Sequence, residues 1–256
     1  MFVFTHTHRS VLRVAGPDAA AFLQGLITAD AAGLSVGAAG YGALLSPQGR
    51  FLHDFLIFRA EETAFLLAPE QARAEDLLTL LKRYVLRASV TLALVPEKVL
   101  FSADQALPGT AADPRCAALG FVGIGVPPQE TAWEDYETLR LRHAVPDGGR
   151  DMPVGEALIL DYGLDTLGAV AWTKGCYVGQ EVTARMHYKA QKKKAFVPVH
   201  LEHGAFPALG TPLTPAGVMG SHHGEWGAAL LPIEQATAEW PEDGKASACK
   251  PLTNTA

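Results

Sequence analysis

The segment 174–185, KGCYVGQEVTAR, gathers an ammonium, a thiol, a phenol, a carboxylate and a guanidinium in one short stretch. Lys174 and Cys176 are two residues apart, so on an extended backbone both side chains emerge on one face, where the ammonium favours the thiolate. Gly175 and Gly179 allow a sharp turn and a close approach by a ligand or by another chain segment. The pattern predicts a turn that carries a reactive cysteine.

Beyond Gly179 the run QEVTAR contains no helix breaker, so the turn is expected to open a short helix. Glu181 and Arg185 are four residues apart, the spacing at which opposite charges pair on a helix. The residue types leave a structural alternative open. Free cysteine is commonly buried, and such a charge pair is usually a solvated face, so a functional and a structural Cys176 are equally supported by chemistry alone.

Asp54 is the second residue that draws attention, because it lies in the otherwise apolar strand sequence FLHDFLIF. A carboxylate in such a strand is costly to bury without a partner, so we expect it to be paired or to face a cavity. It could accept hydrogen bonds from a heterocyclic ligand, or it could form a structural pair with Arg50 or Arg87. The residues do not separate these two roles.

The segment KGCYVGQEVTAR resembles the signature of the YgfZ family, folate-binding relatives of the glycine-cleavage T-protein that assist iron-sulfur cluster maturation. Further blocks resemble the same family in the same order: FLQGLITAD (22–30), YGALLSPQGRFLHDFLIF (41–58), YVLRASV (84–90) and DPRCAALG (113–120). The family usually has a glycine shortly before Pro146, where this chain has Ala144 and Val145. From about Phe206 onward the resemblance is loose.

The resemblance implies an α+β fold like that of the T-protein, in which interwoven layers and a carboxy-terminal β-barrel-like module surround a central cavity. We expect the interwoven folate-binding region to span 1–189 and to include a ferredoxin-like layer around 50–130. The small β module is expected over 190–256.

The function implied by the resemblance is that of a tetrahydrofolate-binding accessory factor for the assembly or repair of 4Fe-4S proteins. Its partners would be iron-sulfur scaffold or client proteins, and whether it turns over a substrate is left open. The expected catalytic residues are Cys176, Lys174 and Asp54. The residues expected to bind folate are Asp54, Tyr177, Gln180, Glu181, Arg185 and Asp161.

Two alternatives compete with this interpretation. A tetrahydrofolate-dependent aminomethyltransferase of glycine cleavage would share the fold and Asp54. The cysteine signature speaks against it, as does Arg142, which stands where those relatives place a folate-binding glutamate. A cysteine-dependent hydrolase would need a histidine within hydrogen-bond reach of Cys176, and His187 is the nearest in sequence.

Composition narrows the function classes. The formal net charge of -6 does not favour nucleic acid or an anionic membrane, and KAQKKK (189–194) is interpreted as a solvated turn between two strands. Cys116, Cys176 and Cys249 form no CxxC pair, so neither a disulfide framework nor a stable metal site is expected. No stretch is apolar enough for a membrane span, and these features predict a cytoplasmic protein. The pairs His6 with His8 and His222 with His223 are expected at the surface.

Hydrophobic periodicity and turn residues predict the remaining elements. Strands are expected over 2–4, 11–14, 41–45, 50–58, 65–67, 90–95, 99–101 and 121–126, helices near 18–27, over 70–84 and over 131–143, and short strands after 194.

Overall fold

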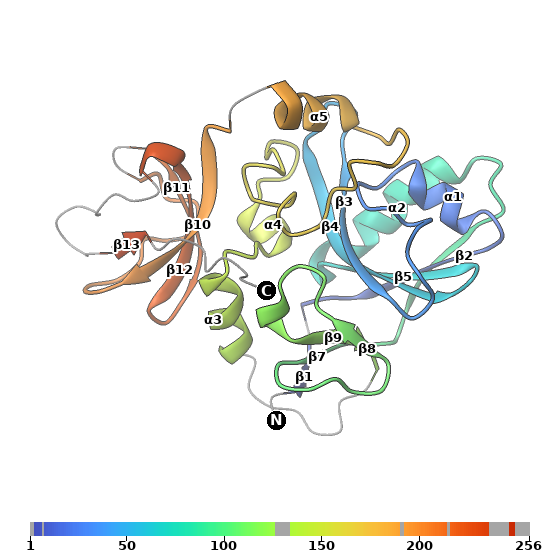
Figure 1. Ribbon diagram of the computed structural model, residues 1–256, viewed down its shortest axis with the longest axis horizontal. Coiled ribbons are helices and arrows are strands. Elements are labelled where there is room, and N and C mark those ends of the chain that lie inside the picture. The colour runs from blue at the N-terminus through green and yellow to red at the C-terminus, as the bar shows by residue number, and fades with distance from the viewer. Residues whose placement is uncertain are drawn as a thin grey trace.

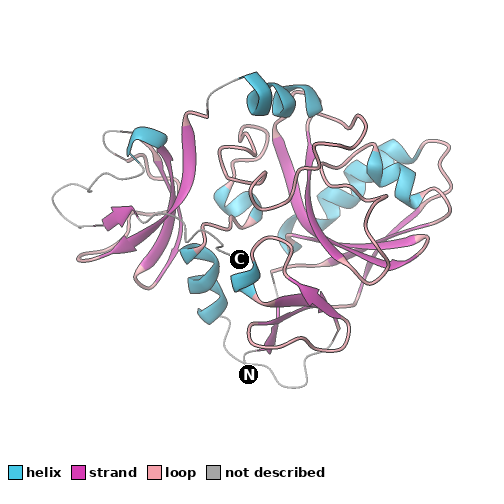
Figure 2. Ribbon diagram, viewed as in Figure 1, coloured by secondary structure: helices cyan, strands magenta, loops and turns pink. Residues whose placement is uncertain are grey.

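The computed structural model describes residues 3–6, 8–125, 134–189, 192–213, 216–235 and 246–248. These residues form three antiparallel sheets grouped around short helices and long connecting segments (Figures 1 and 2). The arrangement is α+β, because each sheet is antiparallel and the helices lie beside the sheets instead of linking parallel strands.

The largest sheet has five strands and carries the predicted Asp54. Its order is β3 (Ala39–Leu45), β4 (Phe51–Glu61), β5 (Ala64–Pro69), β2 (Val11–Ala15) and β6 (Thr91–Val95). One face packs against α1 (Ala19–Gln24) and α2 (Ala74–Val85), with Phe55 and Ile57 of β4 in that core. The neighbouring residues Leu56 and Phe58 belong to a second core, so this strand is buried on both faces.

The second sheet shows how the amino-terminal layers are interwoven. Its order is β1 (Val3–Thr5), β7 (Val99–Ser102), β9 (Phe121–Ile124) and β8 (Thr110–Ala112). Although β1 and β2 are neighbours in the chain, they join different sheets. Residues 50–130 therefore contribute strands to two sheets. Within the five-stranded sheet, the antiparallel order β4-β5-β2-β6, with α1 and α2 as the connecting helices, is that of a ferredoxin-like layer, but β2 adds one of its strands from outside the expected bounds.

The third sheet consists of β11 (Val218–His223), β12 (Trp226–Pro232), β10 (Lys194–Leu201) and β13 (Ala246–Ala248), in that order. It packs against α3 (Glu134–Arg142), and α4 (Gly148–Asp151) lies between it and the five-stranded sheet (Figure 1). Three short 3-10 helices span Gln71–Arg73, Ala117–Leu119 and Ile233–Gln235. The division of the chain after residue 189 stays a prediction.

The helix after the signature segment is longer than the sequence indicated. It is α5 (Gln180–Lys189), because RMHYK continues the run without a breaker. The segment 189–194 therefore connects a helix to β10, and the predicted turn between two strands was wrong. Of the helix expected over 131–143, the first three residues lie outside the described residues.

Ala144 marks a strained position. Its φ is +50°, in the left-handed region that favours glycine, and this is where the family resemblance led us to expect one. The side chain is nearly buried, so packing holds the alanine in this conformation. Within the described residues, every helix is too short or too polar to cross a lipid bilayer.

His53 of β4 gives the fold a pH-dependent component. Its ring is buried, with Nε2 3.1 Å from a carboxylate oxygen of Asp76 on α2, and burial together with Arg73 lowers its pKa to about 4. Between that pH and the ordinary pKa of 6.5, the His53 ring is protonated in the unfolded chain but stays neutral in the folded chain. Stability is therefore present at neutral pH and falls as the pH is lowered toward 4.

We predict that His53→Gln reduces this loss. Between about pH 7 and about pH 4.5, the variant should lose on the order of 2 kcal/mol less free energy of unfolding than the wild type. Urea unfolding at both pH values measures the difference. The matched control is His203→Gln, at an exposed histidine, which should follow the wild type. Equal losses in all three proteins would contradict the assignment.

Candidate functional site

Cys176 lies exposed on a turn that is anchored on both sides to the segment that follows α1. Before it, the amide of Ala171 donates to the carbonyl of Thr28 at 3.0 Å. After it, the amide of Val178 donates to the carbonyl of Gly25 at 3.2 Å. Because both ends of the turn are held by the segment that follows α1, the thiol is presented to solvent from a fixed backbone.

Gly179 shows why this turn needs glycine. Its φ is +81°, and a Cβ there would lie 2.5 Å from the carbonyl oxygen of Ser46 and 3.1 Å from the Cα of Gly49. The predicted close approach is therefore made by another chain segment, the 46–49 turn between β3 and β4. This packing fixes the start of α5 against the sheet.

Lys174 anchors the turn through two backbone carbonyls. Its ammonium donates to the carbonyl of Ile27 at 2.8 Å and to that of Ala29 at 2.7 Å, and it lies 5.2 Å from the centre of the Tyr177 ring. Burial lowers its pKa to about 8, with Asp30 opposing the change. These contacts give Lys174 a positioning role. Its predicted action on the Cys176 thiol has no described contact to support it.

The other signature residues divide between the interior and the surface. Tyr177 is buried, and burial raises its pKa to about 12. Its amide donates to the side-chain oxygen of Gln180 at 3.4 Å. Glu181 and Arg185 are exposed on α5, and the structure describes no ion pair between them. The expected pair on a solvated face is therefore not formed.

His187 is not placed to act as a base for the Cys176 thiol. Its ring stacks on Trp172, with centroids 3.8 Å apart and an angle of 14° between the planes. No hydrogen bond from a histidine to the Cys176 thiol occurs in the part of the chain that the structure describes. The geometry therefore lacks the nucleophile and base pair that a cysteine-dependent hydrolase needs.

Asp54 is buried in a network of charges. One carboxylate oxygen accepts hydrogen bonds from Arg9 at 3.1 Å and from the Tyr41 hydroxyl at 2.9 Å. The expected structural partners, Arg50 and Arg87, do not pair with it. Among the described residues the other oxygen, Oδ1, has no hydrogen-bond partner. It faces Gly148, where a Cβ would come within 3.0 Å of it.

The network continues from Arg9 into α4 and the third sheet. Arg9 also pairs with Asp147 at 3.3 Å. Burial acts to raise the pKa of Asp147, but Arg140 and Arg9 outweigh it and hold the pKa well below its usual range. Arg140 pairs with Asp151 at 3.1 Å and with Glu137 on its own helix. Each buried charge thus has an opposite charge beside it, as a low-dielectric interior requires.

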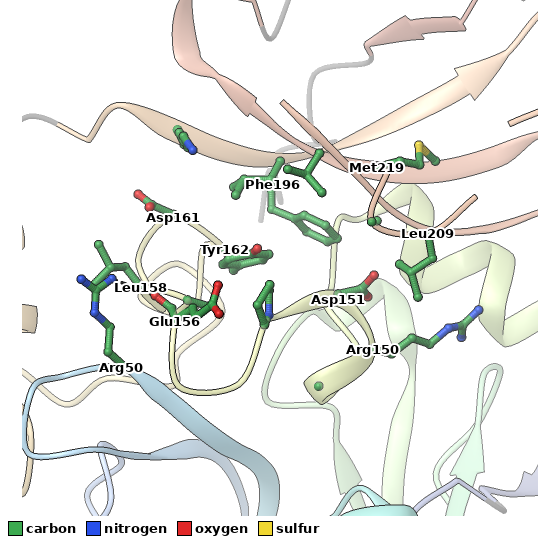
Figure 3. Close-up of a pocket in the computed structure, with 18 of the residues that line it drawn as sticks. Arg50, Arg150, Asp151, Glu156, Leu158, Asp161, Tyr162, Phe196, Leu209 and Met219 are labelled. Carbon is green, nitrogen blue, oxygen red and sulfur yellow. Dashed lines mark hydrogen bonds between the residues drawn. The ribbon is translucent and has the colours of Figure 1, made fainter. Parts of the chain in front are cut away.

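A cavity of about 640 Å³ lies between this network and the third sheet (Figure 3). Tyr162 and Phe196 of β10 both line it and are in contact with each other, with ring centroids 5.3 Å apart. Burial raises the pKa of Asp161 at this cavity, and the opposite charges of Lys192 and Lys194 only partly offset that change. The remaining charged groups of the lining are Arg50, Arg150, Asp151, Glu156, Lys193 and Lys194.

The predicted site residues are therefore spread over three places. Cys176, Lys174, Tyr177 and the α5 residues belong to the anchored turn, and Asp54 belongs to the buried network. Among the described residues that line the cavity, Asp161 is the one assigned to folate from the sequence. Asp54 is connected to the cavity through Gly148, whose neighbour Gly149 lines it.

Sequence reasoning missed the basic residues that organise the interior. Arg9 follows THTH between two of the expected strands, and nothing in its neighbourhood marks it as buried. Arg140 and Glu137 lie in the helix expected over 131–143, and both are buried. Their spacing of three residues was an available signal for a pair. The surface prediction for His6 was also wrong, since it is buried against Tyr136.

Comparison with known proteins adds three findings. A family described as the GCVT N-terminal domain matches residues 2–101. The iron-sulfur cluster assembly factor IBA57, mitochondrial, of Homo sapiens is 37% identical over 227 residues, which cover 75% of this chain and 64% of that protein. The Mus musculus protein of the same name is 34% identical, with 79% and 66% covered. The chain thus spans just under two thirds of the length of these relatives.

The fold is that of the T-protein. The crystal structure of glycine cleavage system aminomethyltransferase T from Bartonella henselae superposes with a TM-score of 0.77 and covers 98% of this chain and 85% of that chain. At 15% identity this likeness concerns the fold alone. The predicted α+β, T-protein-like fold is confirmed.

The anchoring role of Lys174 leads to a prediction. In Lys174→Met the hydrogen bonds to Ile27 and Ala29 are lost, so the free energy of unfolding should fall by about 1–2 kcal/mol. The amide hydrogen of Val178 should exchange with solvent at least tenfold faster. Urea unfolding and hydrogen-exchange mass spectrometry measure both effects, with Lys82→Met on α2 as the matched control. Slower alkylation of Cys176 with unchanged exchange would show instead that the ammonium activates the thiol.

Proposed function

The chain belongs to the YgfZ/IBA57 family of GCVT-domain proteins, and from this premise we propose that it is an iron-sulfur cluster assembly factor in which Cys176 ligates a cluster in transit. The single observation that carries the proposal is the exposed thiol on a turn held at both ends. A thiolate is the usual protein ligand of iron-sulfur clusters.

The arrangement of the thiols supports passage of a cluster in preference to permanent storage. Cys116 is buried in the core, which leaves Cys176 as the exposed cysteine among the described residues. No group of three or more histidine, cysteine or acidic residues that could hold a metal ion occurs in the described part of the chain. A cluster bound at Cys176 therefore needs further thiolates from a carrier.

Transfer at this site is a ligand exchange without a change of redox state. The Cys176 thiol loses its proton as its sulfur bonds to iron, and the thiolate that leaves the iron on the carrier takes up a proton. The anchored turn contributes by holding the sulfur in place, so that little conformational entropy is lost when the bond forms.

Folate binding forms the second half of the proposal, and the cavity fits such a ligand in size and chemistry. A volume of about 640 Å³ lies within the usual range for small-molecule sites. The adjoining rings of Tyr162 and Phe196 would pack against a flat ring, Asp161 would accept its N–H groups, and Lys193 and Lys194 would attract the glutamate carboxylates. When bound, the folate would supply a one-carbon carrier.

Asp54 would affect folate binding only indirectly. Its carboxylate is buried behind Gly148 and is already engaged by Arg9 and Tyr41. Replacing it by alanine would leave Arg9 without its main partner, at a cost of about 3–5 kcal/mol in stability. Loss of folate binding in Asp54→Ala would therefore not distinguish a ligand contact from a damaged interior.

An aminomethyltransferase remains the second candidate, because the fold is shared with such an enzyme. Arg142, where those relatives place a folate-binding glutamate, is exposed and lies over the ring of Trp226 at 5.3 Å. If this candidate is right, the protein should show turnover when it is given an aminomethyl-loaded carrier protein and tetrahydrofolate.

A cytoplasmic location stays a prediction, and the names of the two relatives place those proteins in mitochondria.

We predict that Cys176→Ser loses the capacity to take a cluster from a small donor. The probe is a glutathione-ligated 2Fe-2S cluster, added without oxygen and followed by visible circular dichroism. Wild type should bind one cluster per exposed thiol, and the serine variant at least tenfold less, because a hydroxyl is a poor ligand for this iron. The controls are Cys116→Ala and Cys249→Ser, the latter outside the described residues. Equal uptake by Cys176→Ser would contradict the proposed function.

A second prediction concerns the cavity. Lys194→Glu should weaken tetrahydrofolate binding about tenfold or more, because the attraction between the exposed lysine and a carboxylate of the ligand becomes repulsion. Quenching of tryptophan fluorescence measures the affinity. Lys82→Glu makes the same charge change on α2, away from the cavity, and should leave the affinity unchanged. Absence of binding to the wild type would remove folate from the proposal and leave the cluster function standing.

A further inference from the structure

The outer surface of α5 carries features that neither the cluster ligand nor the folate cavity uses. Towards its end, four exposed residues lie close to one another along the helix: Arg185, His187, Tyr188 and Lys189. Together with Trp172 of the cysteine turn they make up what we call the α5 face. It lies at the outer edge of the molecule, immediately after the signature turn (Figure 1).

Three aromatic rings form one ordered unit on the α5 face. His187 stacks on Trp172 at 3.8 Å, and Tyr188 meets the two rings edge-on, at 4.6 Å from His187 and 6.1 Å from Trp172. Tyr188 is nevertheless 66% exposed. A large ring that is ordered by its neighbours yet open to solvent loses little entropy when a partner covers it, and such residues are enriched at the centres of protein interfaces.

The charge of this face is opposite to that of the molecule. The chain carries a formal charge of -6, yet Arg185 and Lys189 of the α5 face are both cationic and the run 185–194 contains no acidic residue. Glu181 is the acidic residue on the same helix, one turn before Arg185. A local positive surface on a negatively charged protein attracts an acidic patch on a partner. The remaining, negative surface repels the same partner, so the partner is oriented toward the positive patch.

The nearby thiol indicates what the partner carries. Trp172 and Cys176 belong to the same anchored turn, so the aromatic unit and the sulfur are fixed relative to each other. A cluster ligated by thiolates carries net negative charge, which the cations of the α5 face would stabilise as it approaches. We infer that the α5 face docks the acidic surface of an iron-sulfur carrier protein and so delivers the carrier's cluster to Cys176. This inference rests on the proposed function.

Nucleic acid fits this surface less well. Single-stranded nucleic acid also binds where cations and stacked rings alternate, but it needs a groove that follows several phosphates. The α5 face is one short helix flanked by a negatively charged molecule, which suits a compact protein patch. An anionic membrane would require an apolar face on α5, whereas the large apolar side chains of this helix, Val182 and Met186, are partly buried.

The test uses an oxidised, acidic 2Fe-2S ferredoxin as the carrier, with the full chain immobilised and affinity measured at low and raised ionic strength. Wild type should bind in a salt-sensitive manner. The double variant Tyr188→Ala, Lys189→Glu should bind at least tenfold more weakly, because it loses the exposed ring and reverses one charge. The matched control combines Leu86→Ala with Lys82→Glu, at an exposed apolar residue and an exposed lysine near the end of α2, and should bind within twofold of wild type.

The outcomes separate docking from the cluster function. The double variant retains Cys176, so it should still take a cluster from the glutathione-ligated donor. Loss of that uptake as well would place the damage in the fold or in the turn and overturn the docking role. Unchanged affinity of the double variant, or no binding by the wild type, also overturns it. Tighter binding of a single-stranded oligonucleotide or of phosphatidylserine vesicles than of ferredoxin would assign the face to another class of partner.

Discussion

A buried network of ion pairs holds the five-stranded sheet and the third sheet together around α4. Arg9, which precedes β2, joins Asp54 of β4 to Asp147 at the start of α4. Arg140 of α3 joins Asp151, at the other end of α4, to the Ser221 hydroxyl of β11. Removing one charged residue would leave its partner buried and unpaired, away from water. The two sheets and α4 must therefore keep their relative positions. The cavity beside α4 depends on this constraint.

The cysteine turn is built on a different principle. Its anchors are backbone carbonyls and amides of the segment after α1, with Lys174 spanning Ile27 and Ala29. Thr28 between them bonds to Ala43 of β3 and to Ala169, so the same short segment holds the sheet edge and the turn. The result is an exposed sulfur on an ordered support, an arrangement suited to a ligand that must meet a partner protein.

The thiol and the cavity are built from different elements, which separates the two chemistries in the proposal. The cavity is lined mainly by the segment after α4 and by β10 to β12, whereas the thiol belongs to the turn before α5. The two meet along α5 and the lysines that follow it, since Met186, Lys193 and Lys194 line the cavity. A partner seated on the α5 face would therefore lie close to the cavity lining, which would give folate and the carrier a route to influence each other.

The sequence by itself determined what local chemistry can determine. The glycines of KGCYVGQE indicated a sharp turn with a close approach, the unbroken run after Gly179 indicated a helix, and the signature indicated the family. Only the tertiary structure decided the partners of the charged groups. Asp54 pairs with Arg9, 45 residues away, and Lys174 binds carbonyls more than 140 residues away. Hydrophobic period and turn propensity depend on neighbours in the chain, whereas the partner of a buried charge depends on which distant segment the packing brings beside it.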